Sequence, residues 1–302
     1  MTVMLHTWQK RVLQANVVAQ TGIVVTGAIV RLTASGLGCP TWPECVDGSI
    51  TPTSAQTQSW HKYVEFGNRM LTAVLVVVAI ASIVAVRQHN QNRTQEGLPS
   101  RPLLFRLAVA NFGGIFAQAI LGGITVLTGL NPLTVAAHFL LSIALISVAV
   151  TLLWRIKESS DERLAIISAC AYRGIQVLTA LALLVITIGT LVTGTGPHAG
   201  DSAQITRLPF DPRIISWIHA DAVLLFMGLL IGLLIALYAL NAASALKRQA
   251  KITLAVAFGQ GLIGYVQYFT ALPWVLVAFH VAGACILWIA TLRLLLSTKS
   301  AA

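Results

Sequence analysis

The fold of this chain is constrained most by eight apolar runs, each long enough to cross a lipid bilayer. A membrane-spanning helix needs about 20 mainly apolar residues, and hydrophobic residues make up 56% of this 302-residue chain, against 10% charged. The runs cover residues 12–32, 66–86, 105–128, 133–154, 171–193, 216–239, 251–270 and 273–294. The sequence therefore predicts an all-α, multi-pass membrane protein and excludes an ordinary soluble domain.

The basic residues between these runs predict how the chain crosses the membrane. Fifteen of the 20 Lys and Arg residues fall on one side, together with both ends of the chain, and five fall on the other: Arg31, Lys62, Arg69, Arg207 and Arg213. Because cytoplasmic segments are richer in Lys and Arg, we expect cytoplasmic termini in a cell membrane, with the loops 33–65 and 194–215 outside. This scattered charge does not indicate nucleic-acid binding. The first run has no clear cleavage site and is expected to stay as a helix.

Two segments of the chain repeat one plan. Residues 116–138 and 258–280 both contain Phe, then Gln two residues later, and end in Ala-x-His, at a constant offset of 142. Gln118 and His138 thus correspond to Gln260 and His280. An internal duplication with four helices per copy gives both copies the same orientation in the bilayer. We therefore predict two tandem, pseudo-symmetric four-helix bundles, covering residues 1–156 and 157–302.

Three of the seven histidines fall inside the apolar runs, where ionisable groups are costly and usually functional. His138, His219 and His280 all lie on the order of 10 Å below the outer surface, at 1.5 Å per helical residue. His219 and His280 come from the second and fourth helices of one bundle, an arrangement typical of two axial ligands of a haem iron. Zinc would need further ligands that the sequence does not offer. The histidines at 6, 89 and 198 are expected on the surface.

The N-terminal half differs at one of these positions. Asn68 corresponds to His219, so the strong second ligand is missing there, while His138 corresponds to His280. Glu65 and His61 precede Asn68 on the same face of the helix, provided that the helix starts early enough. We interpret this asymmetry as a fixed cofactor in the C-terminal half and a substrate in the N-terminal half.

Several polar residues near these positions have two interpretations. Gln118 and Gln260 could form hydrogen bonds between helices or contact a porphyrin edge, and the sequence favours the first. Arginines near the outer helix ends could bind haem propionates or simply extend to the membrane interface; these are Arg31, Arg69, Arg207 and Arg213. Glu65 could act as an acid or pair with Arg69, four residues further on. Cys39 and Cys45 could form a disulfide if their loop faces an oxidising compartment, with two free thiols as the alternative.

At this point the chain resembles the heme A synthase family, in an actinobacterial-like form. The residues that carry the resemblance are Ser35-Gly-Leu-Gly-Cys-Pro-Thr-Trp-Pro-Glu-Cys45, Glu65-Phe-Gly-Asn-Arg69 and the histidines at 138, 219 and 280. The resemblance implies a haem b held by His219 and His280, and haem O bound as substrate by His138, His61, Asn68 and Arg69. It also implies Glu65 as the catalytic residue, a Cys39–Cys45 disulfide, and oxidation of the C8 methyl of haem O to a formyl group. The haem A formed would serve terminal oxidases.

This sequence departs from the family pattern in two places. The family usually has His where Asn68 stands, and His61 is a substitute ligand on the same helix face. Some members also have a second cysteine pair in the outer loop of the C-terminal half, but residues 194–213 contain no cysteine. Cys170 and Cys285 are therefore expected to be buried structural residues.

Two other classes of protein share some of these features. A diheme cytochrome that oxidises quinol would need two equally saturated haems, and a transporter with a duplicated fold would show broken helices at the midplane. Neither is favoured, because Asn68 breaks the first pattern and the runs contain few interruptions. For the enzyme, we expect haem O synthase, an electron donor and a second copy of the chain as partners.

Overall fold

The computed structural model describes residues 5–201 and 206–301, and its described part contains eight long helices. Their bounds are α1 Thr7–Leu32, α2 His61–Gln95, α3 Pro102–Leu127, α4 Pro132–Arg155, α5 Ala169–Thr195, α6 Pro212–Ala239, α7 Ser244–Phe269 and α8 Trp274–Leu296. Each is long and apolar enough to span a membrane. The predicted all-α membrane fold is confirmed.

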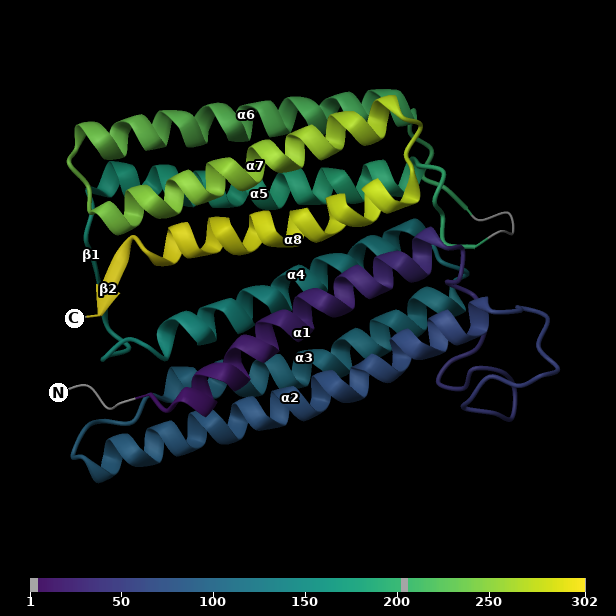
Figure 1. Ribbon diagram of the computed structural model, residues 1–302, viewed down its shortest axis with the longest axis horizontal. Coiled ribbons are helices and arrows are strands. Elements are labelled where there is room, and N and C mark those ends of the chain that lie inside the picture. The colour runs from purple at the N-terminus through teal and green to yellow at the C-terminus, as the bar shows by residue number, and fades with distance from the viewer. Residues whose placement is uncertain (1–4, 202–205, 302) are drawn as a thin grey trace.

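The helices form two four-helix bundles that lie one against the other (Figure 1). In the first bundle α1 packs on α2, α2 on α3, α3 on α4 and α4 back on α1, and α5 to α8 repeat this ring in the second bundle. The bundles meet through α1 and α4 on one side and α5 and α8 on the other. The predicted pair of pseudo-symmetric bundles is confirmed, while the boundary at residues 156 and 157 stays a prediction.

Local sequence explains where several helices begin. Pro102, Pro132 and Pro212 each stand in a first turn, where the missing N–H of proline costs no hydrogen bond. Asn131 and Asp211 precede two of these prolines and accept hydrogen bonds from the first backbone N–H groups of α4 and α6. These caps fix the helix ends that carry the candidate site residues.

Both termini lie at one end of the bundles, which we call the terminal end, and the 33–60 loop lies at the other, the loop end (Figure 1). At the terminal end the segment between the bundles is ordered by ion pairs. Arg101 pairs with Asp161 at 2.8 Å, and Arg163 pairs with Glu158 at 3.1 Å. Strand β1 (Arg163–Ala165) pairs antiparallel with strand β2 (Lys299–Ala301) near the C-terminus. The charged linker is thus a structured contact between the bundles.

The surface predictions for three histidines had different outcomes. His6 is exposed, as expected, and His198 is half-buried and shares a hydrogen bond of 2.9 Å with the carbonyl of Leu272. The prediction for His89 was wrong, because its side chain is only 2% exposed. Helix α2 continues nine residues beyond the predicted apolar run, to Gln95, and the linker folds over its end, where Arg93 donates to the carbonyl of Ser159 at 3.0 Å.

The two bundles are also joined at the loop end. The N–H of Gly36 donates to the carbonyl of Gly200 at 2.7 Å, next to a bridge between Ser35 and Asp201. Arg31, at the end of α1, donates to the carbonyl of Thr193 in α5 at 2.9 Å. The two bundles are therefore held together at the loop end as well as at the terminal end.

Candidate functional site

Each of the three membrane histidines lies in front of a glycine on the neighbouring helix. A Cβ placed on Gly122 would lie 3.1 Å from the Cε1 atom of His138, and a Cβ on Gly264 would lie 3.3 Å from the Cε1 atom of His280. In the same way Gly189 faces His219, at 3.2 Å. Since any larger side chain would press on the ring, these glycines define three cradles for imidazoles.

Asn68 occupies the fourth position of this set. A Cβ on Gly27 of α1 would lie 3.8 Å from the Nδ2 atom of Asn68, just as Gly189 of α5 faces His219. Helices α1 and α2 correspond to α5 and α6 in the duplication, so Asn68 stands where the second bundle has an imidazole. The four positions thus hold three imidazoles and one amide.

Two glutamines fix the backbone of the helices that carry these histidines. The amide of Gln118 on α3 donates to the carbonyl of His138 at 3.1 Å, and the amide of Gln260 on α7 donates to the carbonyl of His280 at 2.9 Å. Gln118 also donates to the hydroxyl of Ser142. The predicted hydrogen bonds between helices are confirmed, and they give α4 and α8 the same register against their neighbours.

His219 and His280 face each other across the second bundle. Their ring centroids lie 6.5 Å apart, with the ring planes at 75°. A metal–imidazole bond of about 2 Å on each side, plus the half-width of each ring, gives a separation of about 6 Å, so one iron atom fits between them. The Nδ1 atom of His280 is buried without a hydrogen-bond partner among the described residues. The pair therefore suits the axial positions of a haem.

Other types of metal centre find no support in the described part of the chain. No three His, Cys, Asp or Glu side chains come together there as ligands for one ion. A tetrahedral zinc site needs three or four such groups. A pair of histidines is too few for such a zinc site, whereas a haem needs only two axial ligands from the protein.

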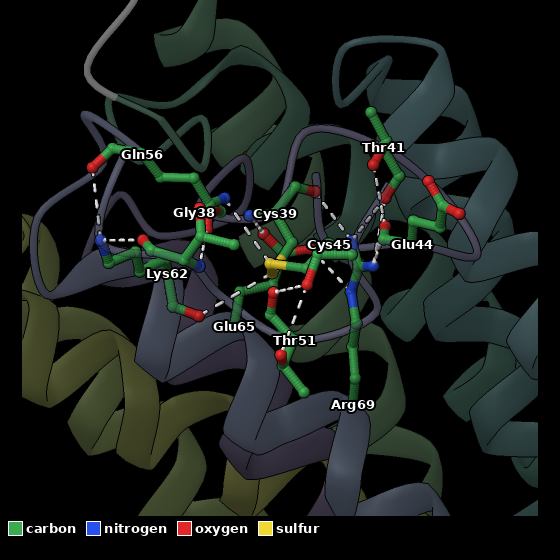
Figure 2. The surroundings of a disulfide bond; sticks show 12 residues. Gly38, Cys39, Thr41, Glu44, Cys45, Thr51, Gln56, Lys62, Glu65 and Arg69 are labelled. Carbon is green, nitrogen blue, oxygen red and sulfur yellow. Dashed lines mark hydrogen bonds and ion pairs between the residues drawn. A yellow bond between two sulfur atoms is a disulfide. The ribbon is translucent and has the colours of Figure 1, made fainter. Parts of the chain in front are cut away.

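At the loop end, Glu65 and Arg69 fasten the 33–60 loop to α2 (Figure 2). The Oε2 atom of Glu65 accepts a hydrogen bond of 2.6 Å from the backbone N–H of Cys39, and its Oε1 atom pairs with Arg69 at 2.6 Å. The Glu65 side chain is 7% exposed. Both interactions are charge-assisted and therefore strong. The pairing with Arg69 that the sequence offered as an alternative role is present.

Arg69 uses its remaining N–H groups on the same loop. It donates to the carbonyls of Cys39 at 2.8 Å, Thr41 at 3.1 Å and Glu44 at 3.1 Å. These three acceptors lie within the Cys39–Cys45 segment (Figure 2). The guanidinium thus orders the loop over the end of the first bundle.

His61 is the first residue of α2, so it shares the predicted helix face with Glu65 and Asn68. Its Nδ1 atom lies 2.8 Å from the hydroxyl of Ser35, and its ring stacks on Trp60 with centroids 4.1 Å apart. His61 therefore belongs to the polar network of the loop end, two turns from the position that corresponds to His219.

Comparison with known proteins assigns the chain to a family. A family profile described as COX15-CtaA, cytochrome oxidase assembly protein, matches residues 10–292. The chain belongs to this family. Heme A synthases from Geobacillus thermodenitrificans and Geobacillus kaustophilus are 29% and 31% identical over 117 residues, which is 38% of this chain and 32% of theirs. The heme A synthase of Listeria welshimeri is 27% identical over 200 residues, 65% of this chain and 61% of its own.

This chain of the heme A synthase family therefore matches about a third of the Geobacillus proteins and 61% of the Listeria protein. The family resemblance that the motifs predicted is confirmed. The matches do not test its actinobacterial affinity, which stays a prediction.

The four cysteines of this family member comprise one bonded pair and two free cysteines. The sulfur atoms of Cys39 and Cys45 lie 1.97 Å apart, as in a disulfide bond, and both residues are fully buried. Cys285 is buried, as expected. The burial predicted for Cys170 was wrong, because it lies exposed in the first turn of α5, at the terminal end.

The structure adds two contacts of the loop that sequence reasoning missed. The Nζ atom of Lys62, a residue only 6% exposed, donates to the carbonyl of Thr53 at 2.7 Å, and so ties the far part of the loop to α2. The ring of Trp42 packs directly on Gly123 of α3. No signal in the sequence pointed to this contact, since the adjacent glycines 122 and 123 look alike there, although one faces His138 and the other this tryptophan.

Proposed function

We propose that this protein is a heme A synthase that oxidises the C8 methyl of haem O to a formyl group by successive hydroxylations. The haem A formed would serve terminal oxidases. The observation that carries the proposal is the unequal occupancy of four equivalent positions, two imidazoles in the second bundle against one imidazole and one amide in the first. Membership of the heme A synthase family supports it.

In this proposal the second bundle holds a resident haem b through His219 and His280. The ring separation of 6.5 Å and the cradles at Gly189 and Gly264 support this assignment. When bound, a bis-histidine haem supplies one-electron transfer. The protein contributes rigidity, because Gln260 fixes the carbonyl of His280 and so the orientation of α8.

The first bundle binds haem O as substrate. His138 is the iron ligand in this half, with Asn68 on the opposite helix and with His61 and Arg69 toward the loop end. Glu65 is the carboxylate nearest to these groups in the family motif, and we assign it the catalytic role of stabilising charge or moving protons at the porphyrin rim. One oxygen of Glu65 accepts from the N–H of Cys39 and the other from Arg69, which leaves a lone pair of Oε2 open to a proton.

The orientation and partners complete the proposal. With 15 of 20 basic residues on the side of the termini, the terminal end faces the cytoplasm and the loop end faces outward. Haem O synthase would deliver the substrate, an electron donor would act on the resident haem, and a second copy of the chain is a further partner. The two bundles correspond to residues 1–156 and 157–302.

Haem extraction and chromatography test the function directly. Cells that make haem O but lack their own heme A synthase should accumulate haem A when this chain is expressed, and the purified protein should hold haem B together with haem O or A. Two haem B molecules per chain would instead indicate a diheme cytochrome, and a protein without haem would indicate a transporter.

Glu65→Gln tests the catalytic assignment, because the amide can still accept from the N–H of Cys39 but cannot carry the charge. We expect this variant and Glu65→Ala to keep the haem of the second bundle and to accumulate haem O or a partly hydroxylated product. Haem A at the wild-type level in Glu65→Gln would contradict a catalytic role for this residue. Glu44→Gln is the matched control, since Glu44 contacts only the loop through its carboxylate.

A further inference from the structure

Among the described residues, the amide of Asn68 carries an unpaired oxygen, as the amides of Asn16 and Gln118 do in the same bundle. Its Oδ1 atom is fully buried and has no hydrogen-bond partner in the part of the chain that the structure describes. A buried carbonyl oxygen without a donor is costly, and native proteins rarely keep one unless it serves a bound ligand or water. The sequence could have placed an apolar residue here at no such cost.

A cavity lies beside Asn68. Its volume is about 220 Å³, and its lining comes from α1 and α2, namely Thr26, Ile29, Val30, Val64, Asn68 and Leu71. The hydroxyl of Thr26 already donates to the carbonyl of Ile23 in its own helix, at 3.2 Å. Asn68 is therefore the member of this lining that has a polar atom unpaired in the described chain, and the other residues around the cavity are mainly apolar.

The backbone around Asn68 would accept a histidine. Gly27 faces Asn68 as Gly189 faces His219, and no side chain on Gly27 would obstruct an imidazole ring. The room for a strong ligand has been kept while the ligand itself is absent. The two copies therefore differ here in the side chain, Asn68 against His219, while both have a glycine on the neighbouring helix.

From these observations we infer that Asn68 makes the substrate iron a five-coordinate or weakly six-coordinate centre. His138 is its one strong protein ligand, and the amide oxygen of Asn68 binds the opposite face weakly, either directly or through one water molecule. This inference rests on the proposed function, since it concerns the haem bound in the first bundle. It predicts a high-spin haem there and a low-spin haem in the second bundle, because only two imidazoles provide a strong axial field.

Electron paramagnetic resonance and visible spectra of the full chain, purified with haem O from cells that also express a haem O synthase, test the inference. We expect one high-spin and one low-spin haem in the wild type, and two low-spin haems in Asn68→His. Asn68→Gln, which keeps an amide, should keep the high-spin signal. Two low-spin haems in the wild type, or an unchanged high-spin signal in Asn68→His, would overturn it.

A titration with imidazole keeps the inference testable even if Asn68→His does not fold. Free imidazole should convert one haem equivalent of the wild-type protein from high to low spin, because one axial position is weakly held. No conversion would overturn the inference. A different result would contradict the proposed function alone: the wild type binds haem O and shows this mixed spectrum, but the cells make no haem A. A chain that binds a single haem would overturn both.

Discussion

The two bundles share a backbone and differ in the side chains they place in it. In the second bundle His219 and His280 face each other as a pair of imidazoles, while in the first bundle His138 and Asn68 hold the corresponding positions, each in front of its own glycine. The two copies share the glycine cradles but differ in one side chain. Two properties of a haem site are thereby separated, namely its position and the ligation of its iron. In the proposed function the glycines set where a haem lies, and the residue at position 68 or 219 sets how its iron is held.

The loops sharpen this difference. The first bundle carries a disulfide loop that Glu65, Arg69 and Lys62 fasten to the start of α2. In the second bundle Ser216 stands at the position of Glu65, and its hydroxyl donates to its own helix, to the carbonyl of Pro212 at 2.6 Å. The sequence of its loop contains no cysteine. Just one of the two bundles has a loop anchored over its end. This agrees with the proposal of a substrate site in the first bundle and a resident haem in the second.

The largest effect is expected from removing an imidazole of the second bundle. His219→Ala and His280→Ala should each abolish the low-spin b-type spectrum, because each side chain supplies one of two axial bonds. His138→Ala should leave that spectrum intact and weaken binding of haem O. Visible spectra of the purified variants measure this, with the exposed residue His6 changed to Ala as control. A normal spectrum in both second-bundle variants would contradict the assignment of His219 and His280 as the two axial ligands.

Filling a cradle should have the next largest effect. The new Cβ of Gly264→Ala or Gly122→Ala would press on the ring of His280 or His138, and such overpacking costs about 1 to 3 kcal/mol. Each 1.4 kcal/mol corresponds to about a tenfold loss of affinity, so Gly264→Ala should weaken haem b and Gly122→Ala should weaken haem O. Gly261→Ala and Gly113→Ala are matched controls, since a Cβ there meets no atom within 4 Å. Haem titrations should find both controls unchanged.

The disulfide should contribute less and only to the first bundle. Closing a loop of seven residues stabilises a fold by about 2 kcal/mol in the chain-entropy model. Reductant should therefore lower the thermal midpoint of the wild type but not of the variant in which Cys39 and Cys45 are both Ser, and the haem b spectrum should survive in both. Mass spectrometry of the non-reduced protein checks the bond itself. Two free thiols in that measurement would refute the disulfide.

The smallest effect is expected from the glutamines on α3 and α7. Gln260→Leu leaves the carbonyl of His280 without its donor and should cost about 1 kcal/mol. Gln118→Leu should do the same for His138. Gln249→Leu is the matched control, because Gln249 donates in the same way to the carbonyl of Ala290 at 3.3 Å. All three variants should lose similar stability in thermal unfolding, but only Gln260→Leu should shift the haem b spectrum.

Sequence reasoning predicted the features that depend on periodicity and repetition. The apolar runs determine the eight helices, and the constant offset between the copies determines that Asn68 corresponds to His219. The cradles were not predicted, because a glycine that faces a ring and a glycine that merely lets two helices approach look the same in a sequence. The contact of Gly122 with His138, beside the contact of Gly123 with Trp42, separates these roles only in three dimensions.

The wrong predictions concern tertiary cover. His89 follows an apolar run among polar residues, as surface residues do, yet the linker that packs over it comes from about 70 residues further along the chain. Cys170 adjoins an apolar run, yet it lies exposed in the first turn of α5. Composition describes a residue's neighbours in the chain, and burial depends on neighbours in space.

The contact between the bundles has the form of a symmetric dimer. Helix α4 packs on its own counterpart α8, and the contact of α1 with α8 is repeated by that of α5 with α4. This is the pattern of an isologous interface, in which two copies use the same surface. A dimer of identical four-helix chains would have equal ligands in both halves, since one gene would encode both. Joining the copies in one chain removes that restriction and permits an amide at position 68 where the other copy has an imidazole at position 219.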